Sequence, residues 1–112
     1  MAARAVIDYF VLDALANDVE SLDGVLALLN HADVGWAAEY GRHFTPQDVV
    51  PVLLREVRQD LLRVCLWSDF EGALVPAAEG VIPEEPVDRC WFMLTPRGRL
   101  LLESWSPEDR PR

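Results

Sequence analysis

Apolar residues recur every three or four positions in several stretches of this chain, which is the spacing of one face of an α-helix. From about residue 5 to residue 17 two neighbouring rows form a broad apolar stripe, and acidic residues such as Asp8 lie off it. A break at residues 19–20 precedes Ser21, which is a good N-cap for the next helix. The spacing predicts helices at residues 5–17, 22–30, 46–60 and 96–105, with one further helical turn near residues 36–40.

Shorter apolar runs bounded by turn residues predict β-strands. Residues 64–67 and 90–94 are expected to pair as antiparallel strands, with Trp67 and Trp91 facing each other across the pair. Between these strands the sequence predicts a turn at residues 68–72, a short strand at 73–75 and an acidic, proline-containing loop at 76–88.

The two ends of the predicted helix at residues 46–60 carry distinct signals. Thr45 and Asp48 are both suitable N-caps, and Pro51 falls within the first turn only if Asp48 is the cap. At the other end Asp60 stands where a residue in the left-handed conformation would terminate the helix. We therefore expect an irregular start and a left-handed end.

Two segments resemble bacterial winged-helix domains. In residues 91–103 an apolar strand runs into Thr95 and Pro96, and the Leu-Thr-Pro-x-Gly-Arg pattern resembles their last strand and closing helix. Residues 54–64 resemble the segment that leaves the recognition helix in MarR and PadR regulators, which usually have glycine at the position of Asp60. The resemblance implies an α+β winged helix: a three-helix core, an antiparallel wing of two to three strands and a C-terminal closing helix, in one domain at residues 1–105 followed by a polar tail at 106–112.

The net charge of −9 is concentrated in two acidic segments. Residues 1–40 hold seven acidic residues against one arginine, and residues 67–88 hold six acidic residues and no basic one. A field of this sign favours a basic protein partner and disfavours a polyanion such as DNA.

The resemblance and the charge point to different partners. In DNA-binding winged helices the recognition helix, here residues 46–60, enters the major groove, although Arg55 beside Glu56 also fits a solvated helix face. Because an acidic wing repels phosphates, we expect a small regulatory or inhibitory protein-interaction module, with a DNA-binding transcription regulator as the alternative. Candidate DNA contacts are Gln47, Arg55, Arg58, Gln59 and Arg63, and candidate partner contacts are Asp69, Glu71, Glu79, Glu84, Glu85, Asp88 and Trp105.

The sequence lacks the grouped residues of a catalytic or metal site. His31 and His43 stand in an irregular stretch, and no phosphate-binding glycine loop or nucleophile motif is present, so we expect no enzyme, cofactor or metal. Cys65 and Cys90 lack ligand neighbours at zinc-site spacing and are expected to be buried thiols. Because no apolar run is long enough to span a bilayer or serve as a signal peptide, we expect no membrane association and a cytoplasmic location.

A homodimer is a further expectation, because many winged-helix regulators pair through terminal helices. The helix at residues 5–17 and Trp105 are the expected contacts. The predicted core consists of Val6, Phe10, Leu15, Leu26, Leu29, Leu53, Leu54, Val57, Leu61, Leu66, Phe92, Leu94 and Leu101.

Overall fold

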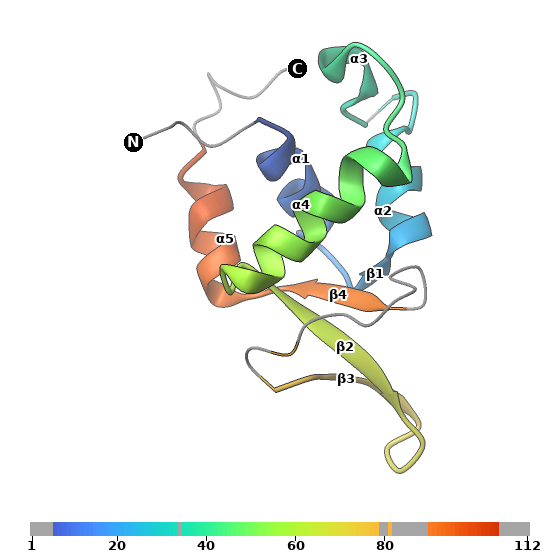
Figure 1. Cartoon of the computed structure of the whole chain (residues 1–112), viewed down its shortest axis with the longest axis vertical. Helices are drawn as coiled ribbons and strands as arrows, with labels where there is room; N and C mark the ends of the chain where they lie inside the picture. The colour runs from blue at the N-terminus through green and yellow to red at the C-terminus, as the bar shows by residue number, and fades with distance from the viewer. Residues whose placement is uncertain (1–5, 34, 79–80, 82–89, 106–112) are drawn as a thin grey trace.

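The computed structural model describes residues 6–33, 35–78, 81 and 90–105 and shows an α+β protein with helices against one face of an antiparallel sheet (Figure 1). The first helix ends earlier than predicted, and the expected break at residues 19–20 overlaps a short strand. Among the described residues no helix is long and apolar enough to cross a membrane. In chain order the elements are α1 (Val6–Ala14), β1 (Glu20–Ser21), α2 (Leu22–Leu29), α3 (Ala37–Tyr40), α4 (Pro46–Arg58), β2 (Leu62–Ser68), β3 (Ala73–Pro76), β4 (Trp91–Leu94) and α5 (Pro96–Glu103).

The four strands have the order β1-β4-β2-β3, and every neighbouring pair is antiparallel. The expected pairing of β2 with β4 is confirmed, and Cys65 lies opposite Trp91. The expectation that Trp67 faces Trp91 is wrong, because Trp67 pairs with Leu74 of β3. Beyond Cys65 the ladder with β4 ends, and the rest of β2 extends into a hairpin with β3.

The core lies between the helices and the inner face of the sheet. Leu62, Val64 and Phe92 are each no more than 1% exposed. Two predicted core residues are instead about half exposed: Val6 begins α1, and Leu66 lies on the hairpin beyond the β4 ladder. The other predicted core residues are buried or partly buried.

The buried side of α1 includes a carboxylate. Asp8, Val11 and Leu12 are each no more than 3% exposed, and Leu15 just beyond the helix is buried as well. The prediction that Asp8 lies off the apolar stripe is therefore wrong, because positions 8, 12 and 15 share one helix face. The Asp8 carboxylate accepts a hydrogen bond from the guanidinium of Arg55 on α4.

Local signals set the C-terminal end of α4 as predicted. Asp60 has a φ of 59°, its N–H donates to the carbonyl of Val57, and the Leu61 N–H donates to the carbonyl of Glu56. This pattern is a Schellman motif, which satisfies carbonyls that a helix end leaves open. The Thr95 hydroxyl donates to the Asp60 carbonyl at 2.6 Å and accepts from the Gly98 N–H at 3.0 Å. The start of α5 is therefore tied to the end of α4.

Thr45, one of the two predicted caps, is the N-cap of α4, with Pro46 in the first turn and Pro51 inside the helix. The Thr45 N–H donates to the Asp48 carboxylate at 2.9 Å. The Arg42 guanidinium holds the same carboxylate with two hydrogen bonds, of 2.7 and 2.6 Å. Asp48 thus joins the loop before α4 to its first turn.

We expect Asp48→Asn to lower stability at neutral pH and to weaken its acid dependence. The hydrogen bonds from Arg42, and next that from the Thr45 N–H, hold the pKa of Asp48 well below its ordinary value of 3.8. A carboxyl with a lowered folded-state pKa contributes stability above its unfolded-state pKa, and that contribution is lost as the pH falls toward the folded-state value. In urea unfolding from about pH 7 to about pH 2, the stability difference between the two proteins should shrink below about pH 4. A difference that does not change with pH would contradict this assignment.

Candidate functional site

The predicted DNA-contact residues do not form one exposed basic surface. Arg55 is bound to the buried Asp8, and the Arg63 guanidinium donates to Asp60 at 3.0 Å. Two of the three candidate arginines are therefore paired with carboxylates of the same chain. Gln47, Arg58 and Gln59 are exposed along α4 and at its end.

The turn that joins β2 to β3 is the most exposed apolar feature of the described chain. We call Trp67, Asp69, Phe70 and Glu71 the hairpin tip. Phe70 is 98% exposed and Trp67 is 62% exposed. The tip also carries Asp69 and Glu71, two of the candidate partner contacts, and both are exposed.

Hydrogen bonds fix the shape of this hairpin tip. The Trp67 indole N–H donates to the Asp69 carboxylate at 2.9 Å, which holds the indole beside a negative charge. The Glu71 N–H donates to the Ser68 hydroxyl at 3.2 Å, and Gly72, with a φ of 63°, closes the turn. The tip therefore presents two aromatic rings and two carboxylates on a defined turn. Phe70 is not among the predicted contact residues, although an aromatic residue within an acidic turn has no strand or helix face on which to be buried.

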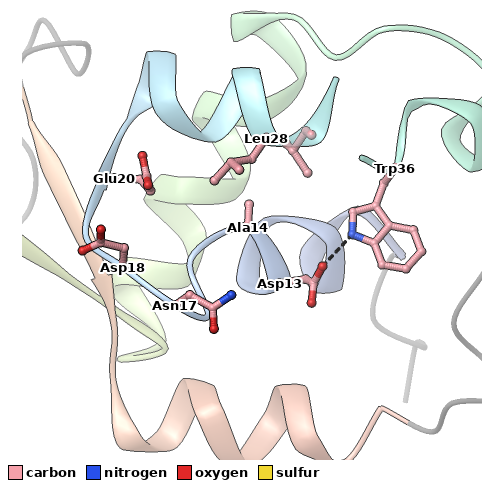
Figure 2. Close-up of a pocket in the computed structure, with 8 residues that line it drawn as sticks. Asp13, Ala14, Asn17, Asp18, Glu20, Leu28 and Trp36 are labelled. Atoms are coloured by element: carbon pink, nitrogen blue, oxygen red, sulfur yellow. Dashed lines mark hydrogen bonds between the residues drawn. The ribbon is translucent and has the colours of Figure 1, made fainter. Parts of the chain in front are cut away.

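A cleft of about 300 Å³ opens between the C-terminal part of α1 and α2 (Figure 2). The Trp36 indole N–H donates to the Asp13 carboxylate at 2.8 Å on one side of the cleft, and Asp18 and Glu20 lie on the other. Leu28, which is 39% exposed, forms part of its apolar lining. The cleft was not predicted, because Trp36 reaches it from an irregular segment.

Trp105 is buried, contrary to its prediction as a partner contact. It is 6% exposed and stacks on Tyr9 with ring centroids 4.9 Å apart. Trp36 lies 5.6 Å from it and stacks on Phe10 at 4.8 Å. These aromatic side chains fill the space between α1 and α5, so Trp105 closes the core of its own chain.

The remaining candidate chemistry is limited. Within the described residues no group of three His, Cys, Asp or Glu side chains could hold a metal ion. Cys65 and Cys90 are buried thiols, and burial raises the pKa of Cys65. Both are free cysteines, and Cys90 packs in the core cluster, whereas Cys65 lies opposite Trp91 of β4. The candidate partner contacts Glu79, Glu84, Glu85 and Asp88 lie outside the described residues.

Comparison of the chain with protein-family models, curated proteins and solved structures finds no match.

Proposed function

We propose that this chain is a non-enzymatic winged-helix module that regulates or inhibits a basic protein partner by binding it through the hairpin tip. The winged-helix assignment is supported by the order of the elements. α4 holds the place of a recognition helix, the β2–β3 hairpin that of a wing, and α5 that of the closing helix.

The observation that carries the proposal is the exposure of Phe70 between two carboxylates. Apolar side chains this exposed are candidates for interaction sites, and aromatic residues provide much of the binding energy at protein interfaces. Asp69 and Glu71 select a partner with basic side chains, because opposite charges steer association and like charges suppress it. Guanidinium groups of the partner would also bind favourably over the faces of the two rings.

DNA binding through α4 is the alternative, supported by the exposure of Gln47, Arg58 and Gln59. Two observations weigh against it. Arg55 and Arg63 are engaged with carboxylates, and the hairpin tip, which would approach the DNA backbone, is acidic. Phosphate neutralisation supplies most of the affinity of DNA-binding proteins, so this arrangement favours the protein partner.

Affinity capture from the source cells tests the proposal. The wild-type protein should retain a basic protein, and Phe70→Ser should bind it at least about tenfold more weakly, because removal of a central interface aromatic costs about 1.4 kcal/mol or more of binding free energy. Val6→Ser changes an apolar residue that is 52% exposed elsewhere and should leave capture unchanged. The retained protein is then purified, and its affinity for the wild type, for Phe70→Ser and for Val6→Ser is measured by titration. Equal affinity for wild type and Phe70→Ser would contradict the proposal.

A salt series with a random-sequence DNA duplex pool tests the alternative. We expect no duplex binding even at low salt, where electrostatic attraction is strongest. Binding that weakens steeply with salt and is reduced by Arg58→Ala would instead show phosphate contacts and favour the DNA-binding regulator.

A further inference from the structure

A groove lies where the C-terminal end of α4 meets α5, and its chemistry is opposite to that of the hairpin tip. It has a volume of about 550 Å³. Leu100 is 69% exposed within it, and Arg58, one residue before the lining residue Gln59, is exposed. The residues that line this α4–α5 groove are Gln59, Leu61, Arg97, Leu100 and Leu101.

The groove and the hairpin tip are complementary in two respects. Phe70 is 98% exposed, and the groove offers leucine side chains against which an aromatic ring can be buried. Asp69 and Glu71 flank Phe70 in the sequence, while Arg97 lines the groove and Arg58 is exposed on α4 one residue before the lining residue Gln59. Apolar burial and charge pairing would therefore both be satisfied if a tip occupied a groove.

A tip cannot occupy the groove of its own chain. Leu61 lies in the groove, and β2 begins at the next residue and leads away from it to the tip. The seven residues of β2 span roughly 20 Å in extended conformation. Figure 1 shows α5 and the β2–β3 turn beyond opposite ends of β2. The contact therefore requires a second copy of the chain.

We propose that two copies of this chain form a reciprocal dimer in which the hairpin tip of each copy docks in the α4–α5 groove of the other. In such a dimer a twofold axis relates the two copies, so that each tip meets the groove of the other copy. The two contacts are then identical, and the assembly closes at two copies. In this dimer Phe70 is buried against Leu100, and Asp69 and Glu71 face Arg58 and Arg97.

Exchange of charge between tip and groove tests the dimer. The tip variant carries Asp69→Arg and Glu71→Arg, and the groove variant carries Arg58→Glu and Arg97→Glu. All four positions are exposed, so circular dichroism should show both variants folded. By sedimentation velocity the wild type should dimerise, and each variant alone should dimerise at least about tenfold more weakly because its tip and groove carry like charges.

An equimolar mixture of the two variants should restore a dimer, because the basic tip of one then meets the acidic groove of the other and both contacts are matched. Glu39→Arg reverses an exposed charge on α3, away from tip and groove, and should leave dimerisation unchanged. Phe70→Ser should weaken the dimer without any change in charge.

Three results would overturn this inference: a wild-type protein that stays monomeric at about 1 mM, a mixture that forms no heterodimer although both variants are folded, or assemblies larger than two copies. The dimer and the proposed function use the same hairpin tip, so a basic partner that binds through Phe70 must displace the second copy. A monomeric wild type that still captures a basic protein through Phe70 would remove the dimer and leave the proposed function in place. A wild-type protein that dimerises but captures no basic protein would support the dimer and contradict the proposed function.

Discussion

Gly98→Ala should destabilise the protein by about 3 kcal/mol or more in urea unfolding, because an added methyl group would meet rigid backbone. A Cβ atom at Gly98 would lie 2.1 Å from the carbonyl oxygen of Leu61 and 2.9 Å from a methyl carbon of Leu94. The Leu61 segment cannot move away easily, because the Thr95 N–H also donates to the same carbonyl at 3.1 Å. Relief of the clash would therefore pull α5 away from the end of α4.

Gly24 provides a matched control, because its added Cβ would also find an atom at 2.1 Å. That atom is a carboxylate oxygen of Glu20, which can rotate away at little cost. Gly24 lies within α2, where alanine is favoured over glycine by up to about 1 kcal/mol. Gly24→Ala should therefore be neutral or stabilising. Similar losses of stability for both substitutions would show that the close approach of α5 to Leu61 is not the cause.

Arg55→Ala should lower the free energy of unfolding by about 2 kcal/mol, whereas Arg58→Ala should change it by less than about 0.5 kcal/mol. The Asp8 side chain is 5% exposed, and the Arg55 side chain that neutralises it is 42% exposed. Removal of Arg55 leaves the negative charge of Asp8 in the core without this guanidinium, which costs more than the loss of a surface ion pair. Arg58 is exposed, so its removal leaves the core unchanged.

A double-mutant cycle with Asp8→Asn separates this role from DNA contact. If Arg55 serves to neutralise Asp8, Arg55→Ala should cost clearly less stability in the Asp8→Asn background than in the wild type. Equal costs in both backgrounds would contradict the structural role. Arg55 could then be tested as a DNA contact by measuring how duplex binding of the wild type and of Arg55→Ala depends on salt concentration.

Short-range signals in the sequence predicted the element boundaries best. Ser21 and Thr95 each accept a hydrogen bond from a backbone N–H three residues later, and Asp60 adopts the left-handed conformation at the end of α4. These interactions involve neighbouring residues, so composition and spacing are sufficient to indicate them. In contrast, β1 has two residues and exists because Glu20 and Ser21 pair with β4, far along the chain.

The candidate surfaces were less predictable, because they depend on which side chains the fold brings together. The sequence predicts Asp8 on the surface, but the fold brings it to Arg55, 47 positions away. The ion pair therefore places Asp8, a predicted surface residue, in the core and occupies Arg55, a predicted DNA contact. Trp105, a predicted partner contact, is a core residue because α5 packs on α1. Phe70 is exposed because the β2–β3 hairpin extends beyond the ladder that joins β2 to β4.

The stacking of Trp105 on Tyr9 also has a consequence for synthesis. α1 leaves the ribosome before the other described elements. The rings of Tyr9, Phe10 and Trp36 all contact Trp105, so they lack these contacts until residue 105 has emerged. The helices up to α4 can form earlier, yet contacts between the two ends must wait for nearly the whole described chain. During translation this apolar cluster is therefore open to solvent and to chaperones, and folding is completed only when Trp105, just beyond α5, arrives.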